Sequence, residues 1–145
     1  MCGIIAVIRR PSNRAVPTRD DILGLVDGTA NVLDGIALEH ADGPLATIVE
    51  RLSAADTLLR GTSGVRLLIA DPGLSDLLRA ELGSLNAHLD ALEADLDSKA
   101  TVDALDLEAV NALLISARDA AWAIERDRLR AAVVVSDLGL SLIHI

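Results

Sequence analysis

The sequence predicts a mainly α fold, with one short N-terminal strand followed by about four helices, two of which form a long antiparallel hairpin. Hydrophobic residues make up 51% of the 145-residue chain, yet it has no Phe, no Tyr and only one Trp. Its core must therefore be built from Leu, Ala, Val and Ile, which suits packed helices better than a strand-rich sandwich. Leucines at heptad spacing and a cluster of turn-forming residues near the start also favour this fold class.

The strand is expected at the start of the chain. Met1 to Ile8 contains a nearly continuous apolar, β-branched run, which is typical of a buried strand. Arginine, proline, serine and asparagine residues between positions 9 and 17 then provide turn chemistry. We therefore divide the chain into a strand and turn (1–17), a helical region (18–139) and a terminal segment (140–145).

Two helices are expected in the first half of the helical region. Thr18 is placed to cap the first, whose apolar positions extend as far as Leu33, although its glycines weaken it. The second opens at Gly43 and Pro44 and closes at Gly61. Its apolar side chains recur every three or four residues, as on one face of an amphipathic helix.

The second half of the chain predicts a helical hairpin. Asp71 and Pro72 provide an N-cap and a first helical residue for the longest helix. A last helix starting near Asp106 would pack antiparallel against it across the loop 97–105. The expected seam of the long helix consists of Leu78, Leu82, Leu85, Leu89, Leu92 and Leu96, and that of its partner of Leu107, Val110, Leu114, Ala117, Ala121 and Ile124.

Composition argues against several kinds of partner. The formal net charge of -9 repels a phosphate backbone, and base-stacking aromatic residues are nearly absent, so we expect no nucleic acid partner. No stretch approaches the roughly 20 apolar residues that cross a bilayer, so we expect no membrane span. With a single cysteine, Cys2, no intrachain disulfide can form, and a cytoplasmic location is expected.

The remaining chemistry-bearing side chains have structural interpretations. His40, His88 and His144 lie too far apart in sequence for a local metal motif, and no cofactor or metal is expected. Trp122 on its Ala-rich helix is expected to pack. The carboxylates between Glu93 and Glu108 have no calcium-loop spacing and are interpreted as a solvated face.

Cys2 is the candidate catalytic residue. Removal of Met1 would place the thiol and a free amine on the same terminal residue, and an amine with a pKa near 8 can relay the thiol proton near neutral pH. Gly3 would let a substrate approach the backbone closely. The alternative is a buried structural cysteine in an ordinary first strand.

The opening string Met-Cys-Gly-Ile-Ile and its apolar continuation resemble the start of class II glutamine amidotransferases, enzymes of the N-terminal nucleophile (Ntn) type. The resemblance implies an αββα domain whose first strand begins at Cys2, and attack of Cys2 on the side-chain amide of glutamine to supply ammonia. It covers fewer than ten residues. The Arg-Gly-Tyr-Asp-Ser-Ala-Gly type of motif that follows the first strand in familiar members is absent.

Within that family, the helical region resembles an insertion found in bacterial glutamine-fructose-6-phosphate aminotransferases, with Ala121 to Arg130 near its end. This implies glutamine and a sugar phosphate as substrates and leaves a homo-oligomer open. Another class II member, such as amidophosphoribosyltransferase, stays an alternative, as does a non-catalytic helical module that recruits a partner through the hairpin.

The terminal segment 140–145 matches the translation of a transposase adapter used in sequencing libraries. We therefore expect native sequence to end near Gly139 and the chain to be an N-terminal fragment, inactive by itself.

Overall fold

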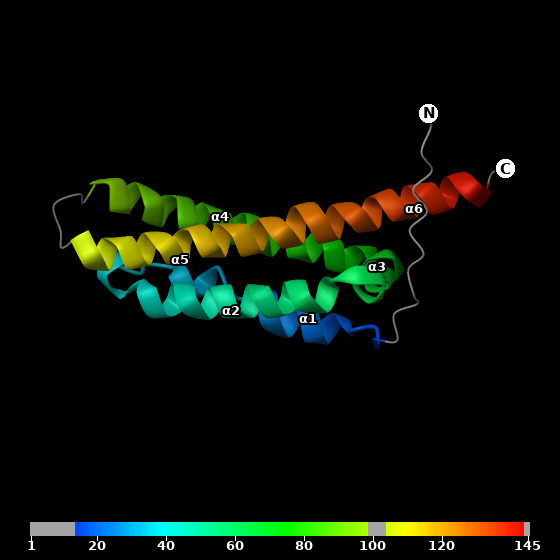
Figure 1. Cartoon of the computed structure of the whole chain (residues 1–145), viewed down its shortest axis with the longest axis horizontal. Helices are drawn as coiled ribbons and strands as arrows, with labels where there is room; N and C mark the ends of the chain where they lie inside the picture. The colour runs from blue at the N-terminus through cyan, green and yellow to red at the C-terminus, as the bar shows by residue number, and fades with distance from the viewer. Residues whose placement is uncertain (1–13, 99–103, 144–145) are drawn as a thin grey trace, which may run out of the picture.

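The computed structural model describes residues 14–98 and 104–143, and this part of the chain is helical throughout apart from its connections (Figure 1). The predicted mainly α fold is confirmed, whereas the predicted strand within residues 1–8 lies outside the described residues. The α-helices are α1 (Arg19–Val26), α2 (Asp42–Leu59), α3 (Gly61–Ala70), α4 (Pro72–Ser98), α5 (Ala104–Trp122) and α6 (Arg130–Ile143). Shorter elements are the 3₁₀ turns η1 (Asn31–Leu33) and η2 (Leu38–His40) and the π-helical segment η3 (Ala123–Leu129).

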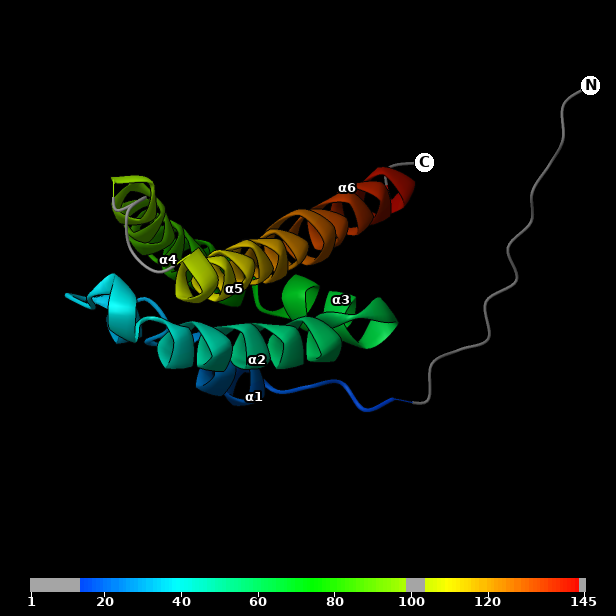
Figure 2. The ribbon, with the colours of Figure 1, turned by 60° about the vertical axis from the view of Figure 1, so that its left-hand side comes forward.

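The helices pack as an elongated bundle. Elements α5, η3 and α6 form one continuous rod that lies across α2, while α1 covers another side of α2 (Figures 1 and 2). The rod also contacts α4, which gives the predicted α4–α5 hairpin, and α3 lies at the end of the molecule toward which α6 runs. No helix among the described residues combines the length and apolar character needed to cross a bilayer.

Aliphatic side chains from every α-helix form one hydrophobic core. Along α2 the buried apolar positions recur at three- and four-residue spacing, and all of these apolar side chains are fully inaccessible to solvent. The α4 seam is buried as predicted from Leu78 to Leu92, and the α5 seam from Val110 to Ala121. The end positions Leu96 and Leu107 are only partly buried, since they lie next to the connection between the two helices.

Two predicted helix caps are present. The Thr18 hydroxyl accepts a hydrogen bond from the Asp21 amide at 3.2 Å, and the Asp21 carboxylate accepts one from the Thr18 amide at 2.7 Å. Likewise, the Asp71 carboxylate accepts a hydrogen bond from the Leu74 amide at 3.0 Å and pairs with Arg19 at 2.5 Å. Asp71 therefore caps α4 and also ties the start of α4 to α1.

Two predictions about the first half of the chain are wrong. The first helix ends at Val26 instead of continuing to Leu33, because the chain turns at Gly28 with a φ of 71° and Leu33 reaches the core from η1. The sequence pattern also assigned no helix between Gly61 and Asp71. The structure has α3 there, a helix that the glycines near its start made hard to recognise.

The predicted pairing of α5 with α4 is incomplete, because α5 packs more extensively on α2 than on α4.

The spacing of buried residues along the rod explains why η3 is π-helical. Buried positions along the rod follow spacings of three or four up to Ile124, but the next buried residue, Leu129, is five residues on. In an α-helix, a residue five positions further along points well away from the line of buried side chains. The i to i+5 hydrogen bonding of a π-helix returns that residue to the buried face. The π segment therefore keeps Leu129 in the core.

A carboxylate on the α4 seam should unfold the bundle. Leu85 and Leu89 are both fully buried, so we expect Leu85→Asp or Leu89→Asp to cost several kcal/mol, on the order of 3 or more, for a buried charge with no partner. Thermal melting followed by circular dichroism measures this loss. The control is Ala87→Asp on the exposed face of α4, which should melt close to the unmodified chain. Equal melting temperatures for the seam and control variants would contradict the packing described above.

Candidate functional site at the corner between α2 and α3

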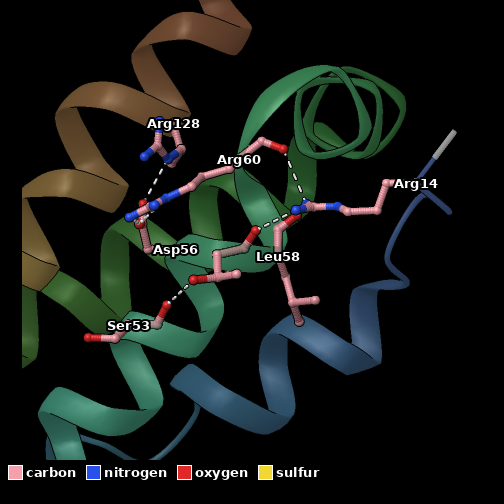
Figure 3. Close-up of polar contacts among 7 residues, drawn as sticks. Arg14, Ser53, Asp56, Leu58, Arg60 and Arg128 are labelled. Carbon is pink, nitrogen blue, oxygen red and sulfur yellow. Dashed lines mark hydrogen bonds and ion pairs between the residues drawn. The ribbon is translucent and has the colours of Figure 1, made fainter. Parts of the chain in front are cut away.

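The predicted nucleophile, Cys2, lies outside the described residues. The described part of its segment begins at Arg14 and leads into α1, so the site that the structure can define is the point where this segment attaches to the helical body. Attachment occurs at the corner where α2 ends and α3 begins (Figure 3).

Arg14 holds the segment to the end of α2. Its guanidinium donates hydrogen bonds to the carbonyl oxygens of Thr57 at 2.8 Å, of Arg60 at 3.2 Å, and of Leu58 (Figure 3). These carbonyls belong to the last turn of α2 and its C-cap residue, at the negative end of the helix dipole, where carbonyls run short of amide partners. The Thr57 carbonyl also accepts a hydrogen bond from the Arg60 amide at 3.4 Å. The Arg14 guanidinium supplies these carbonyls with hydrogen-bond donors, and its positive charge stabilises the negative end of the helix dipole.

The start of α3 holds the same residue from the other side. The Ser63 hydroxyl donates a hydrogen bond to the Arg14 carbonyl oxygen at 2.9 Å, and Ser63 itself is buried. The backbone and the side chain of Arg14 are thus fixed to two successive helices. The described chain therefore starts at a residue that is anchored to this corner.

A buried carboxylate lies on the inner side of the corner. Asp56 is only 4% exposed, although it occupies an otherwise apolar stripe of α2. One of its carboxylate oxygens accepts hydrogen bonds from Arg60 at 2.8 and 2.5 Å, and the other accepts one from Arg128 of η3 at 2.7 Å (Figure 3). Asp56 therefore joins α2, the turn into α3 and the π-helical segment.

The pKa of Asp56 reflects two opposing effects. Burial raises it, but the hydrogen bonds from Arg128 and Arg60, together with the positive charges of these two residues, outweigh burial and lower it below its ordinary value. The carboxylate is therefore ionised at neutral pH. With both oxygens engaged by guanidinium groups, it is neither a general base nor a nucleophile, and its role is structural.

The turn itself depends on glycine. Gly61 has a φ of 71°, a conformation that side-chain-bearing residues rarely adopt. At Gly64, a Cβ atom would lie 1.9 Å from the carbonyl oxygen of Leu59, so only glycine lets α3 fold back this closely on the end of α2. The backbone contact at Gly64 sets the angle of the corner.

The other predicted candidates do not assemble into a site. Among the described residues, no group of three or more His, Cys, Asp and Glu side chains is close enough to hold a metal ion. His88 lies half-buried on α4 with its Nδ1 2.9 Å from the Ser84 carbonyl oxygen. Within the acidic stretch, Glu93 is exposed and pairs with Arg118 at 2.6 Å. The expectation that Trp122 packs is wrong, because its side chain is 58% exposed.

The residues of the corner were not among those predicted from the sequence. Asp56 could have been found, because a charged residue that continues the spacing of the buried Leu52 and Leu59 must have a partner. Arg60, four residues later on the same helix, is one such partner. Arg14 and Arg128 are far away in sequence, and no local pattern connects them to Asp56.

Comparison of the chain with protein-family models, with curated proteins and with solved structures gave no match.

Loss of the Asp56 charge should destabilise the protein in a pH-dependent way. The folded-state pKa lies below the unfolded value, so this stabilisation is present above about pH 4 and is lost as the pH falls through the folded-state pKa. We expect Asp56→Asn to cost on the order of 2 kcal/mol at pH 7 and clearly less at pH 3. Urea denaturation at both pH values measures the difference. The control Asp76→Asn removes an exposed ion pair with Arg79 and should change stability by about 0.5 kcal/mol or less. A pH-independent loss in Asp56→Asn would disprove the role of its charge.

The close contact at Gly64 gives a second prediction. Gly64→Ala should destabilise the chain by on the order of 1 to 3 kcal/mol, because the Leu59 carbonyl must move to admit the methyl group. Gly83→Ala is the matched control, because that glycine lies in α4 with open space around it, and alanine there should stabilise by roughly 0.5 to 1 kcal/mol. Opposite shifts in melting temperature are expected, and shifts of the same sign would exclude this account of the corner.

Proposed function

We propose that this chain is the N-terminal part of a class II glutamine amidotransferase, most like glutamine-fructose-6-phosphate aminotransferase. In this proposal Cys2 is the nucleophile and residues 18–139 form a helical body inserted after the first strand. The observation that carries it is the string Met-Cys-Gly-Ile-Ile at residues 1–5, followed directly by an apolar run. The substrates would be glutamine and a sugar phosphate, and the setting cytoplasmic.

The chemistry follows from a cysteine that carries its own amine. After removal of Met1, the Cys2 thiol would transfer its proton to the α-amine, and the sulfur would attack the side-chain amide carbon of glutamine. The resulting tetrahedral oxyanion would collapse to a glutamyl thioester, and the departing nitrogen would take up the proton as ammonia. Water would then hydrolyse the thioester to glutamate and restore the thiol, while the ammonia is used by a synthase domain.

The arrangement of the helical body is compatible with an insertion. A segment inserted between two neighbouring parts of a domain must receive and return the chain on the same side. The segment at Arg14 and the end of α6 both lie at the end of the molecule where α3 lies, away from the connection between α4 and α5 (Figures 1 and 2). The hydrogen bonds of Arg14 would fix the incoming segment to this end.

If the chain is instead a non-catalytic module, its partner must bind a surface other than the α4–α5 hairpin. The hairpin leucines are buried inside the bundle, so they are not available to recruit a partner without unfolding. Exposed apolar side chains lie instead on α6, where three successive valines and Leu138 are each about half exposed. Amidophosphoribosyltransferase and other class II enzymes stay alternatives for the identity of the synthase.

The proposal is tested at the N-terminus. We expect intact-mass analysis of the purified 145-residue chain to show loss of Met1 and an unblocked Cys2. In the full-length protein, the glutamine analogue 6-diazo-5-oxo-norleucine should label Cys2 and abolish glutaminase activity. Cys2→Ala should remove both labelling and activity while leaving the helical circular dichroism spectrum unchanged. A retained methionine, or glutaminase activity in Cys2→Ala, would refute the assignment.

A further inference from the structure

Trp122 lies on the solvent-exposed side of the rod, next to residues that face the core. The flanking residues Ala121 and Ile124 are buried, whereas the Trp122 side chain is 58% exposed at the last residue of α5. The chain has no other Trp and no Tyr or Phe. Tryptophan is the residue type most enriched among those that dominate binding energy at protein interfaces.

The exposed indole borders a pocket between α4 and α5. The pocket has a volume of about 600 Å³ and opens widely to solvent. Apart from Trp122, every side chain that lines it is polar or charged, so it does not have the character of an apolar ligand site. The lining residues are Asn86 and Asp90 from α4, Arg118, Asp119 and Trp122 from α5, and Glu125 from η3.

The charges around the indole are mostly negative. Arg118 donates hydrogen bonds to Asp90 at 2.7 Å and to Glu93 at 2.6 Å, so its charge is already matched by carboxylates of α4. Asp119 and Glu125 have no ion pair within the described ranges 14–98 and 104–143. They lie three residues before and after Trp122, so that the three side chains share one face of the rod.

We propose that this pocket binds an arginine- or lysine-bearing segment of a partner protein. The face of an indole attracts a cation held against it, and the two uncompensated carboxylates add ion pairs around the same point. A guanidinium fits better than an ammonium, because it can stack on the indole and bond to a carboxylate in the same pose. The net charge of -9 repels an anionic partner. An apolar partner would remove water from the carboxylates without supplying hydrogen bonds in its place.

This inference does not depend on the proposed amidotransferase chemistry, because the pocket belongs entirely to the helical body. It is tested on the 145-residue chain with an end-blocked tetra-arginine peptide. With no other Trp, Tyr or Phe side chain present, intrinsic fluorescence reports on Trp122 alone. We expect saturable quenching that weakens as salt is raised, and none with the uncharged isostere tetra-citrulline. Absence of quenching with tetra-arginine would overturn the proposal.

Two charge variants separate this pocket from general attraction to an acidic chain. Asp119→Asn combined with Glu125→Gln should weaken peptide binding roughly fivefold or more. Asp34→Asn combined with Glu50→Gln changes the net charge equally at exposed positions away from the pocket, and should weaken binding by less than about twofold. Equal effects of the two pairs would mean nonspecific binding and would overturn the proposal.

A third variant identifies the occupant. Trp122→Leu should lower peptide affinity roughly fivefold or more by titration calorimetry, where loss of the fluorophore is no obstacle. Sedimentation should show the same monomeric mass for the unmodified chain and for this variant. If the unmodified chain dimerises and Trp122→Leu does not, a second copy occupies the pocket and the partner proposal fails. If this variant does not fold, the two charge pairs still decide the question.

Discussion

The buried carboxylate of Asp56 is the constraint on which the arrangement of the bundle depends. Removing a charge from water costs several kcal/mol, so its burial is stable only while Arg60 and Arg128 both reach it. Apolar burial is non-directional, so the aliphatic faces of α2 and the C-terminal rod do not by themselves fix how far one helix lies along the other. The Arg128–Asp56 ion pair of 2.7 Å is directional, and it fixes the position of the rod along α2.

The π-helical segment follows from the same requirement. Its seven residues add a wider turn where the rod crosses the end of α2. This turn brings Leu129 to the core and Arg128 to Asp56 on the same side of the rod, which a continuous α-helix would not do. Irregular helical geometry at this crossing therefore has a packing reason, and it needs no catalytic explanation.

Sequence patterns predicted the regular parts of this structure and missed those set by distant contacts. The α4 seam, the caps at Thr18 and Asp71 and the span of α2 all follow from local spacing and local hydrogen bonds, and these predictions are confirmed. Helix α3 was missed because glycine is a poor helix former, yet Gly64 is there to permit a close backbone contact that only tertiary structure reveals. The corner as a site could not be predicted, since Arg14 and Arg128 meet α2 only after folding.

If Cys2 is the nucleophile of the proposed amidotransferase, the attachment of Arg14 limits where a glutamine site could lie. Cys2 and Arg14 are twelve positions apart in the sequence, and an extended backbone spans at most about 3.6 Å per residue. The thiol therefore stays within roughly 40 Å of the corner, whatever path the intervening chain takes. A glutamine site built around Cys2 would have to lie inside that radius, so the helical body would act as a fixed neighbour of the reaction and would restrict the directions from which glutamine and a synthase domain could approach.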